Sequence, residues 1–350
     1  MIEREKLNDL NTYEDVAFSL CNYSRYAFAK MNSNISNFNR LPQNQRSHLV
    51  DLFLRRIHGT KKRIKINQIL LNKIAEIFNS VSILFPPKYI LTFNGLDAAH
   101  LDSLLSQIYR EWSVEGTEER SRCFQPIIDE FCKIYDQKDR SGLRVLVPGS
   151  RLGRLVYELS KTGCHCVYND ADMLMIMTAF GFLNNLYGKG PYDIYPWINE
   201  WGNNYMNSTI LNPVTVPDTF IEPGLKITME VGNFLTCFRS ENCESFDCII
   251  TCFFIDTAPN IIVFIEKIRY LLKNGGIWIN LGHLSSSLEA DGSCIDMDPT
   301  FEEIEHIMFK CMNFQKIKPN TDISCGYMDN KNVINKKKYV CPFFVVRKHV

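Results

Sequence analysis

The stretch RVLVPGSRLGRLVYELSKTGCHCVYND, residues 144–170, decides the fold class of this chain. It begins with an apolar strand, Arg144–Pro148, that stops at a Pro-Gly turn, and it continues with apolar residues at helical spacing. A second strand, Cys164–Tyr168, leads to the acidic residue Asp170. This order is typical of a nucleotide-binding unit, because glycine lets the backbone approach a ligand and the acid accepts hydrogen bonds from ribose hydroxyls.

The glycine pattern of this turn is incomplete. Loops that bind pyrophosphate usually read GxGxxG, whereas here only Gly149 and Gly153 are present and Arg151 lies between them. The turn by itself therefore predicts a nucleotide-type ligand without requiring a dinucleotide.

From residue 144 onward, short apolar strands alternate with helical segments. We expect further strands at Lys226–Val231, Phe246–Ile255, Ile277–Leu281 and Tyr339–Arg347, and helices at Met173–Tyr187, Asn260–Leu272 and Phe301–Lys310. The alternation predicts an α/β fold with a doubly wound, mostly parallel sheet. Phe246–Ile255 is nearly all apolar and should be buried on both faces. Pro342 predicts an edge position or a bulge for the last strand.

The N-terminal part has a different character. Residues 12–138 show apolar residues at helical spacing, and the polar stretch Asp136–Gly142 resembles a linker. We therefore expect an N-terminal helical region at 1–140 and an α/β domain at 141–350. Residues 188–225 are rich in Pro, Asn and Tyr without a clear period, which predicts an insertion in the second domain. Its aromatic residues either roof a small substrate site or pack onto the sheet.

Composition narrows the class of protein. The 39 basic and 39 acidic residues cancel, so no net charge draws the chain to nucleic acid or to a membrane. The first residues are charged and have no apolar core, so we expect no secretory signal, and no apolar run is long enough to span a bilayer. The thirteen cysteines show no paired framework, which predicts reduced thiols in the cytosol or the nucleus.

Two groups of cysteines deserve comparison with metal sites. Cys243, Cys248 and Cys252 have a spacing longer than zinc sites prefer, and two of them lie inside an apolar strand. Cys164 and Cys166 point to one face of their strand, because side chains alternate along a strand. We interpret both groups as buried thiols and expect no metal.

Ligands of open α/β sheets bind at the carboxyl ends of the strands. The residues at those ends are Gly149, Asp170, Asn233, Phe234, Asp256 and His283. The Asn233 side chain can accept a hydrogen bond from an adenine amino group, and Phe234 can flank the base. Asp256 follows three apolar residues, and an acidic side chain at this point is not expected to serve only as a core residue, so we consider it a candidate functional acid. The alternative is that Asp256 is the N-cap of the helix after Pro259.

Five segments resemble the carnosine N-methyltransferase family. They are EWSVEGTEERSRCFQPII, VLVPGSRLGRL, DCIITCFFIDTAPN, LLKNGGIWINLG and YVCPFFVVRK, and the resemblance extends from about Tyr13 to Lys348. It implies a Rossmann-like class I methyltransferase domain, an N-terminal helical region and a homodimer. It also implies transfer of a methyl group from S-adenosyl-L-methionine to the histidine imidazole of carnosine, giving anserine, or of related His-containing di- and tripeptides.

The resemblance also implies roles for individual residues. The cofactor would contact Gln107 and Arg110 at its amino-acid end, Gly149 at its methionine moiety, Asp170 at its ribose, Asn233 and Phe234 at its adenine, and Cys248 nearby. The substrate would contact Asp256, which faces the imidazole, and Tyr339, which closes the pocket. The family's histidine in the loop after the fifth strand aligns with Ser287, and the nearest histidine is His283.

Asp256 is the candidate catalytic residue. A carboxylate that accepts a hydrogen bond from one imidazole nitrogen selects the tautomer in which the other nitrogen carries the lone pair. The same contact raises the basicity of that nitrogen and stabilises the imidazolium product.

The chain departs from the family pattern at three positions. The family loop usually reads PGAGLGR, and Arg151 replaces its middle glycine; at a positive φ angle this would cost about 1–3 kcal/mol. Asn233 stands where the family has an acid, and Ser287 stands where it has a histidine. Three alternatives stay open: another imidazole substrate, a catalytically impaired interaction protein with this fold, and a dinucleotide-dependent oxidoreductase.

Overall fold

The structure, a computed structural model, describes residues 16–81, 98–188, 190–202, 204–258, 260–284, 299–328, 333–336 and 338–349. The chain forms two compact units. The first unit comprises residues 1–117, 177–221 and 328–336, and the second comprises residues 118–176, 222–327 and 337–350.

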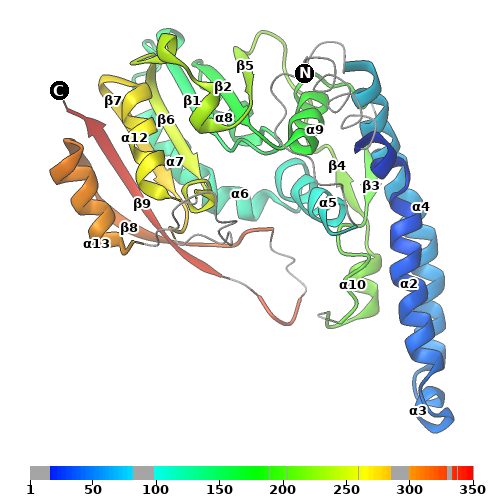
Figure 1. The fold of residues 1–350 in the computed structure, drawn as a ribbon. Helices are drawn as coiled ribbons and strands as arrows, with labels where there is room; N and C mark the ends of the chain where they lie inside the picture. Colours follow the sequence, from blue (N-terminus) through cyan, green and yellow to red (C-terminus); the bar gives the residue numbers. More distant parts are fainter. Residues whose placement is uncertain are drawn as a thin grey trace, which may run out of the picture. The chain divides into compact units, whose positions relative to one another are not determined.

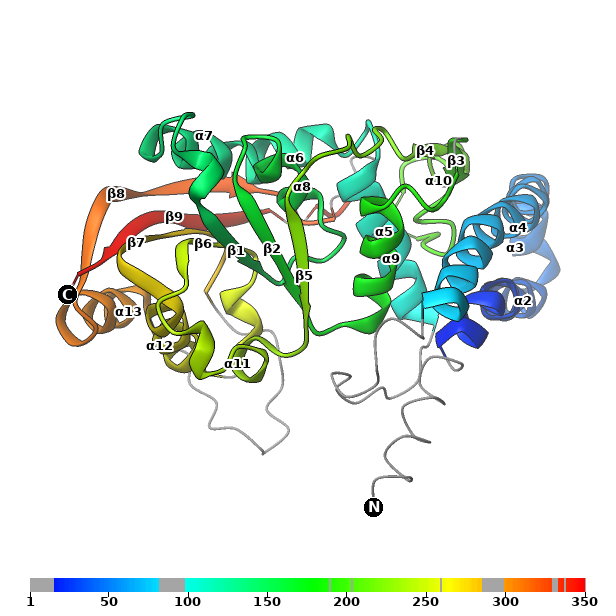
Figure 2. The same cartoon turned by 90° about the horizontal axis from the view of Figure 1, so that it is seen from above.

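The second unit contains a seven-stranded sheet. Its strands are β1 (Arg144–Pro148), β2 (His165–Asp170), β5 (Ile227–Val231), β6 (Phe246–Cys252), β7 (Leu272–Leu281), β8 (Phe314–Cys325) and β9 (Tyr339–Lys348). They lie in the order β5-β2-β1-β6-β7-β9-β8, which can be followed across Figure 2. The pairs from β5 to β7 are parallel, and β9 runs antiparallel to both of its neighbours. The expected doubly wound, mostly parallel sheet is confirmed.

This strand direction brings many chain segments to one edge. The ends of β1, β2, β5, β6 and β7 share the carboxyl edge because these strands are parallel. The end of β8 and the beginning of β9 reach the same edge because β9 is reversed.

Helices cover both faces of this sheet. Figure 2 shows α7 (Gln125–Ile134) and α8 (Arg154–Ser160) on one face. The other face carries α11 (Phe234–Cys237), α12 (Ile261–Leu271) and α13 (Phe301–His306).

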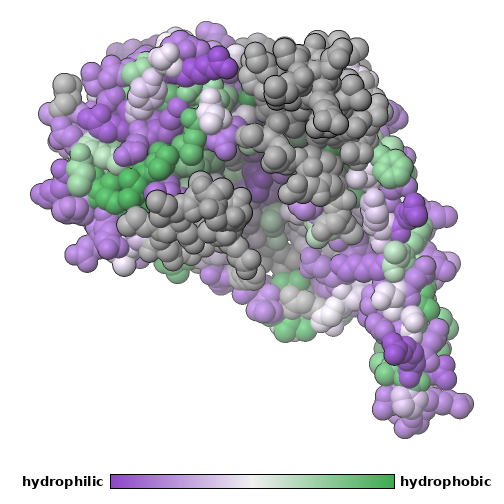
Figure 3. Space-filling view, in the orientation of Figure 1, coloured by the Kyte–Doolittle hydropathy of each residue, from purple (hydrophilic) through white to green (hydrophobic). Residues whose placement is uncertain are grey.

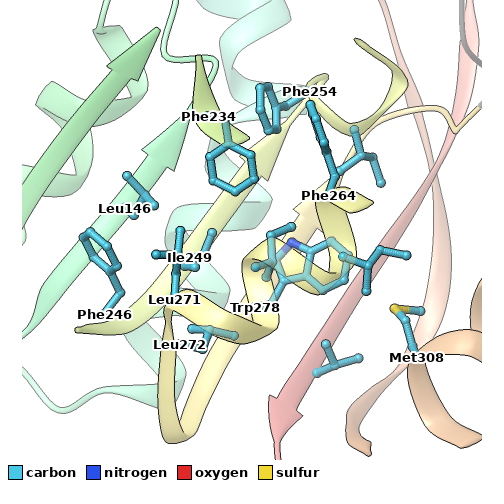
Figure 4. Close-up of a cluster of buried hydrophobic side chains, with 14 of the residues drawn as sticks. Leu146, Phe234, Phe246, Ile249, Phe254, Phe264, Leu271, Leu272, Trp278 and Met308 are labelled. Atoms are coloured by element: carbon cyan, nitrogen blue, oxygen red, sulfur yellow. The ribbon is translucent and has the colours of Figure 1, made fainter. Parts of the chain in front are cut away.

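A large hydrophobic core cluster lies between the sheet and α12. Figure 4 shows Leu146 and Ile249 from the central strands facing Leu271 of α12, with Phe246 and Trp278 beside them. All five side chains are fully buried. Burying a large apolar side chain contributes about 1.5–3 kcal/mol, so this cluster stabilises the packing of α12 on the central strands.

A buried polar network joins β6 to β7 inside this core. Trp278 Nε1 donates a hydrogen bond of 2.8 Å to Thr251 Oγ1, and Thr251 Oγ1 donates one of 2.8 Å to Asn280 Oδ1. All three residues are fully buried, so each polar atom depends on its partner in the network.

Two sequence predictions about the last strands need correction. The strand β8 was not predicted, because an edge strand with two register shifts and a polar sequence shows no clean alternation of apolar residues. Pro342 does not mark an edge strand: β9 lies between β7 and β8. The proline is tolerated because the pairing of β9 with β7 ends at Phe343, so Pro342 has no partner in β7.

The first unit is built on helices. They are α2 (Tyr23–Asn39), α3 (Gln43–Ser47), α4 (Val50–Val81), α5 (Ala98–Trp112) and α10 (Asn207–Leu211), with a small sheet of β3 (Tyr192–Ile194) and β4 (Val214–Val216). Two further helices, α6 (Thr117–Cys123) and α9 (Met173–Leu183), cross the limits of the units. In Figure 1, α2 and α4 run side by side. Figure 3 shows apolar side chains scattered among polar ones along them. Leu52 and Leu54 of α4 are exposed.

The insertion predicted at 188–225 belongs mostly to this helical unit. Asn67 of α4 donates to the backbone oxygen of Tyr195 (3.0 Å) and accepts from its nitrogen (2.7 Å). Trp197 contacts Tyr109 of α5 edge to face, with centroids 4.5 Å apart. Tyr195 and Trp197 of the insertion therefore pack on helices α4 and α5.

The division of the chain also differs from the expected one at residue 140. The first unit ends at 117, and α7 belongs to the second unit. The reason is that α7 is tied to the sheet: the Tyr135 hydroxyl donates to the Asp247 backbone oxygen at 2.9 Å, and Lys318 pairs with Glu130 at 2.9 Å.

The cysteines in the described part of the chain are free thiols. Cys164 Sγ and Cys166 Sγ lie 3.5 Å apart on one side of β2, as strand alternation predicts. Within residues 16–81 and the other described ranges, no group of three or more His, Cys, Asp or Glu side chains is arranged to hold a metal ion. Among the described helices, none combines the length and apolar character that a bilayer-spanning segment needs.

Thr251→Val should lower the free energy of unfolding by roughly 2–4 kcal/mol, because the Trp278 N–H and the Asn280 oxygen would each lose a buried partner at about 1–3 kcal/mol. Chemical denaturation measures the change. The matched control is Thr228→Val on the edge strand β5, where the side chain is exposed and the same substitution should cost less than about 0.5 kcal/mol. Equal effects at both positions would contradict the importance of the network.

Candidate active site

A cavity of about 420 Å³ opens at the carboxyl edge of the sheet. It is lined by Arg151, Phe253, Asp256, Thr257, His283, Tyr327 and Tyr339. These residues follow β1, β6, β7 and β8 or begin β9, so five segments far apart in sequence contribute to one site. Its size suits a small organic ligand.

The turn after β1 has the backbone geometry that its glycines predict. The φ angles are +64° at Gly149, +48° at Arg151 and +80° at Gly153. A Cβ atom placed on Gly149 would overlap the Phe254 ring, so this position requires glycine for space as well as for conformation. Arg151 adopts the left-handed conformation without being glycine, at a cost of about 1–3 kcal/mol.

The carboxylate of Asp170 holds this turn in place. Its Oδ2 accepts a hydrogen bond from the backbone nitrogen of Arg151 at 2.9 Å, and its Oδ1 accepts from those of Ala171 (2.8 Å) and Asp172 (3.0 Å). Burial raises the pKa of the Asp170 carboxyl above its ordinary value, and Arg151 and the hydrogen bonds only partly oppose this shift. A carboxylate offers about four acceptor positions, so one remains for a ligand hydroxyl.

The Arg151 side chain extends to the cavity among polar partners. It forms a hydrogen bond with Tyr327, and its Nη1 lies 3.8 Å from Asp172 Oδ2. Burial disfavours the charged guanidinium, but Tyr327, Asp170 and Asp172 outweigh that effect and raise the pKa of Arg151, so the group is a permanent cation.

Asp256 lies in a short 3-10 turn, Ile255–Thr257, directly after β6. Its Oδ2 is 3.4 Å from His283 Nε2, and its Oδ1 is buried with no hydrogen-bond partner among the described residues. Burial raises the pKa of Asp256 above its ordinary value, while His283 and Arg151 act in the opposite direction. The alternative of a helix N-cap is wrong, because the Asn260 side chain caps α12 by accepting from the Ile262 nitrogen at 3.0 Å.

Aromatic rings form the walls around this acid. The His283 ring stacks on Tyr339 with centroids 4.9 Å apart and planes 14° from parallel, and Phe253 contacts His283 edge-on at 6.0 Å. Phe253 also lies 5.0 Å from Tyr327. Gly282 allows this approach, because a Cβ atom there would lie 2.9 Å from the Phe253 nitrogen.

The structure thus brings together Asp256, His283 and Tyr339 of the predicted substrate residues, while Ser287 lies outside the described residues. Sequence reasoning missed Phe253, Thr257 and Tyr327 as lining residues. Tyr327 was missed together with β8, and Phe253 was assigned to the interior of a strand that in fact ends at Cys252.

Two residues were predicted to contact adenine, and one of them, Asn233, also caps a helix. It lies at the end of β5, and its Oδ1 accepts from the Leu235 nitrogen at 2.8 Å, which caps α11. Phe234 is only 4% exposed and packs against Phe254 and Phe264 at 5.4 Å each. Its ring therefore belongs to the core in this structure, and contact with adenine remains a prediction for both Asn233 and Phe234.

The other predicted cofactor residues are buried. Cys248 is fully buried in the middle of the sheet, in register with Val145 and Ile277. Val145 lies four positions before Gly149 of the turn, and the place of Cys248 near the cofactor stays a prediction. Gln107 and Arg110 are buried on α5 in the first unit, where Gln107 Nε2 donates to Glu111 Oε1 at 2.6 Å; their contact with the cofactor stays a prediction.

Comparison with known proteins identifies the family. The family model described as carnosine N-methyltransferase matches residues 89–350. This chain belongs to the carnosine N-methyltransferase family. The proteins named carnosine N-methyltransferase from Mus musculus and Schizosaccharomyces pombe are 32% and 30% identical to it. Those alignments cover 93% and 84% of this chain and 83% of each relative.

The chain is therefore a methyltransferase, and S-adenosylmethionine is its methyl donor. The residues at the sheet edge fit this cofactor. Gly149 leaves no room for a side chain where the turn passes Phe254, and Asp170 retains one acceptor position for a ribose hydroxyl. The family match sets aside the alternative of a dinucleotide-dependent oxidoreductase.

Gly149→Ala should destabilise the protein and weaken binding of S-adenosylhomocysteine, because the new methyl group meets both an unfavourable φ angle and the Phe254 ring. The matched control is Gly224→Ala, which has a φ of +90° but nothing within 4 Å of the added Cβ. We expect Gly149→Ala to cost at least about 1 kcal/mol more in unfolding free energy than the control. Calorimetry with S-adenosylhomocysteine and chemical denaturation measure both effects; equal results for the two variants would contradict the steric argument.

Asp256→Asn should raise the Tm at neutral pH by roughly 2 °C. Folding raises the pKa of this carboxyl, so its ionised form costs more free energy in the folded protein than in the unfolded chain. The cost is absent below the ordinary pKa of 3.8, grows between that value and the raised one, and is complete above it. The Tm difference from the wild type should therefore shrink as the pH falls toward 4.

The control for this measurement is Asp129→Asn, an exposed carboxylate on α7 whose neutralisation should leave the Tm unchanged. A lower Tm for Asp256→Asn at neutral pH would mean that the contact with His283 outweighs the cost of burial.

Proposed function

We propose that this enzyme methylates the histidine imidazole of carnosine, a β-alanyl-histidine dipeptide, giving anserine. Its relatives bear the name of this activity, and one acid, Asp256, lines the candidate cavity. The observation that carries the proposal is the buried Asp256 Oδ1, which has no hydrogen-bond partner among the described residues and belongs to a residue that lines the cavity.

Such an oxygen requires a donor, because a buried acceptor without a partner loses its hydration free energy. The N–H group of a neutral imidazole is a donor of the correct kind and size. Once Asp256 accepts from one ring nitrogen, the lone pair is confined to the other nitrogen, which then faces the methyl group as the nucleophile.

His283 and Tyr339 support this arrangement. His283 Nε2 lies 3.4 Å from Asp256 Oδ2, so Oδ1 is the carboxylate oxygen that lacks a donor among the described residues, and stacking on Tyr339 limits rotation of the His283 ring. Phe253 and Tyr327, whose ring centroids lie 5.0 Å apart, line the aromatic side of the cavity. A flat heteroaromatic ring fits between such walls because stacking and edge contacts stabilise it.

When bound, S-adenosylmethionine supplies an activated methyl group on a sulfonium. Gly149 and Asp170 would hold the cofactor at the turn after β1, and Asn233 would face its adenine. The protein therefore needs to orient the imidazole, exclude water and compensate the positive charge that the ring acquires. Asp256 serves the last purpose, because its carboxylate lies next to the ring that becomes an imidazolium.

Mass spectrometry of carnosine, homocarnosine and Gly-His incubated with the enzyme and isotopically labelled S-adenosylmethionine tests the proposed substrate. We expect one labelled methyl group on the imidazole of carnosine, at a higher rate than on the other two. Unmodified carnosine under conditions where the protein binds S-adenosylhomocysteine would contradict the proposal.

Asp256→Asn should lower kcat by about 10²-fold or more, because the variant no longer selects the tautomer or stabilises the imidazolium. Affinity for S-adenosylhomocysteine should change little. Single-turnover rates and calorimetry separate the two quantities, and Asp129→Asn should retain wild-type activity. A single-turnover rate near that of the wild type would show that Asp256 has no catalytic role.

A further inference from the structure

We infer that the Arg151 guanidinium docks the carboxylate of the peptide substrate and so makes the enzyme specific for peptides with a free carboxylate near the histidine. The inference rests on the proposed function and adds a residue for substrate specificity to the same cavity.

The first support is the composition of the cavity. Arg151 lines it together with Asp256, His283 and Tyr339. A dipeptide that ends in histidine carries an imidazole N–H and a carboxylate only a few bonds apart. Asp256 complements the first of these groups, and Arg151 is the permanently charged cation that complements the second.

The second support is the state of the guanidinium. Its side chain is 39% exposed, and its contact with Asp172 is 3.8 Å, which is too long for a hydrogen bond. The planar group carries five N–H donors, and the hydrogen bond with Tyr327 uses only part of this capacity. A carboxylate can therefore be held by two parallel hydrogen bonds, which is the geometry that arginine favours.

The third support is the backbone. Arg151 adopts a φ of +48°, a conformation that glycine would occupy without strain. Three hydrogen bonds keep the turn in place: Asp170 accepts from the Arg151 nitrogen, the Tyr168 hydroxyl donates to the Arg151 oxygen at 2.7 Å, and Gly153 donates to the Ser150 oxygen at 2.8 Å. Strained residues that surrounding contacts hold in place concentrate at functional sites.

The cofactor also carries a carboxylate, at its amino-acid end, and it too binds near this turn. We assign Arg151 to the substrate because Arg151 belongs to the cavity of Asp256 and His283, whereas Gly149 is not among the residues that line that cavity. Separate measurements of substrate KM and of S-adenosylhomocysteine affinity distinguish whether Arg151 binds the carboxylate of the substrate or that of the cofactor.

The test compares the wild type with Arg151→Gly, which removes the guanidinium and relieves the backbone, and with Arg151→Lys, which keeps the charge but loses the two parallel hydrogen bonds. The substrates are carnosine and its C-terminal amide. We expect the wild type to prefer the acid. Arg151→Gly should raise KM for carnosine about tenfold or more and leave KM for the amide nearly unchanged, because a hydrogen-bonded charge contact is lost only with the acid.

The same experiment includes two further readouts. Arg151→Lys should give an intermediate KM for carnosine, and the dissociation constant of S-adenosylhomocysteine should change less than about twofold in both variants. Tm measurements verify that the variants are folded. Any decrease in the Tm of Arg151→Gly should be small, because the relief of backbone strain offsets the loss of the polar contacts of the Arg151 side chain.

Several results would overturn the assignment. A weaker affinity for S-adenosylhomocysteine with an unchanged preference between acid and amide would assign Arg151 to the cofactor. Equal losses for acid and amide would mean that Arg151 only shapes the turn. If the wild type methylates neither compound, the proposed function fails instead; calorimetric binding of the two compounds to the S-adenosylhomocysteine complex of wild type and Arg151→Gly then still decides the role of Arg151.

Discussion

The hydrogen bond between the Asp170 carboxylate and the backbone nitrogen of Arg151 is the contact on which the site depends. It joins the tip of β2 to the turn after β1, across 19 positions of sequence. The turn passes through three residues with positive φ angles, one of which is not glycine, so it needs an external acceptor to hold its shape. Held in this way, the turn leaves the face of Gly149 without a side chain and directs Arg151 to the cavity.

The site also depends on the charges of two side chains that line the cavity. A buried acid, Asp256, and a permanent cation, Arg151, line the same small cavity, and Arg151 lowers the pKa of Asp256 less than His283 does. Burial raises the pKa of Asp256, and His283 and Arg151 limit that rise. The buried Asp256 carboxylate thus stays able to accept a hydrogen bond from a ligand, and its burial lowers the stability of the folded protein. In the proposed complex the imidazole N–H would donate to Asp256, and the substrate carboxylate would pair with Arg151.

Much of the sheet was predictable because its central strands have strong local signals. β1 was predicted with its observed bounds, and β5 and β9 differ from the prediction by one residue at one end. Asp170, Asp256 and His283 were predicted at the carboxyl edge because parallel strands bring their ends together. β8 was not predicted, since its polar, irregular sequence depends on pairing with β9, and Tyr327 was lost with it. The burial of Phe234 and Cys248 likewise depends on neighbours that no local pattern reveals.

The sequence by itself determined the α/β class, the order of the central parallel strands along the chain, the glycine turn and the acids that follow those strands. These features are local, because they depend on hydrophobic period, turn residues and the chemistry of single side chains. The tertiary structure alone decided that residues 177–221 join the helical unit, that Asp256 pairs with His283 and does not cap α12, and that Arg151 and Tyr327 share its cavity. These are contacts between distant segments, and only the folded sheet brings the end of β8 and the start of β9 beside the turn after β1.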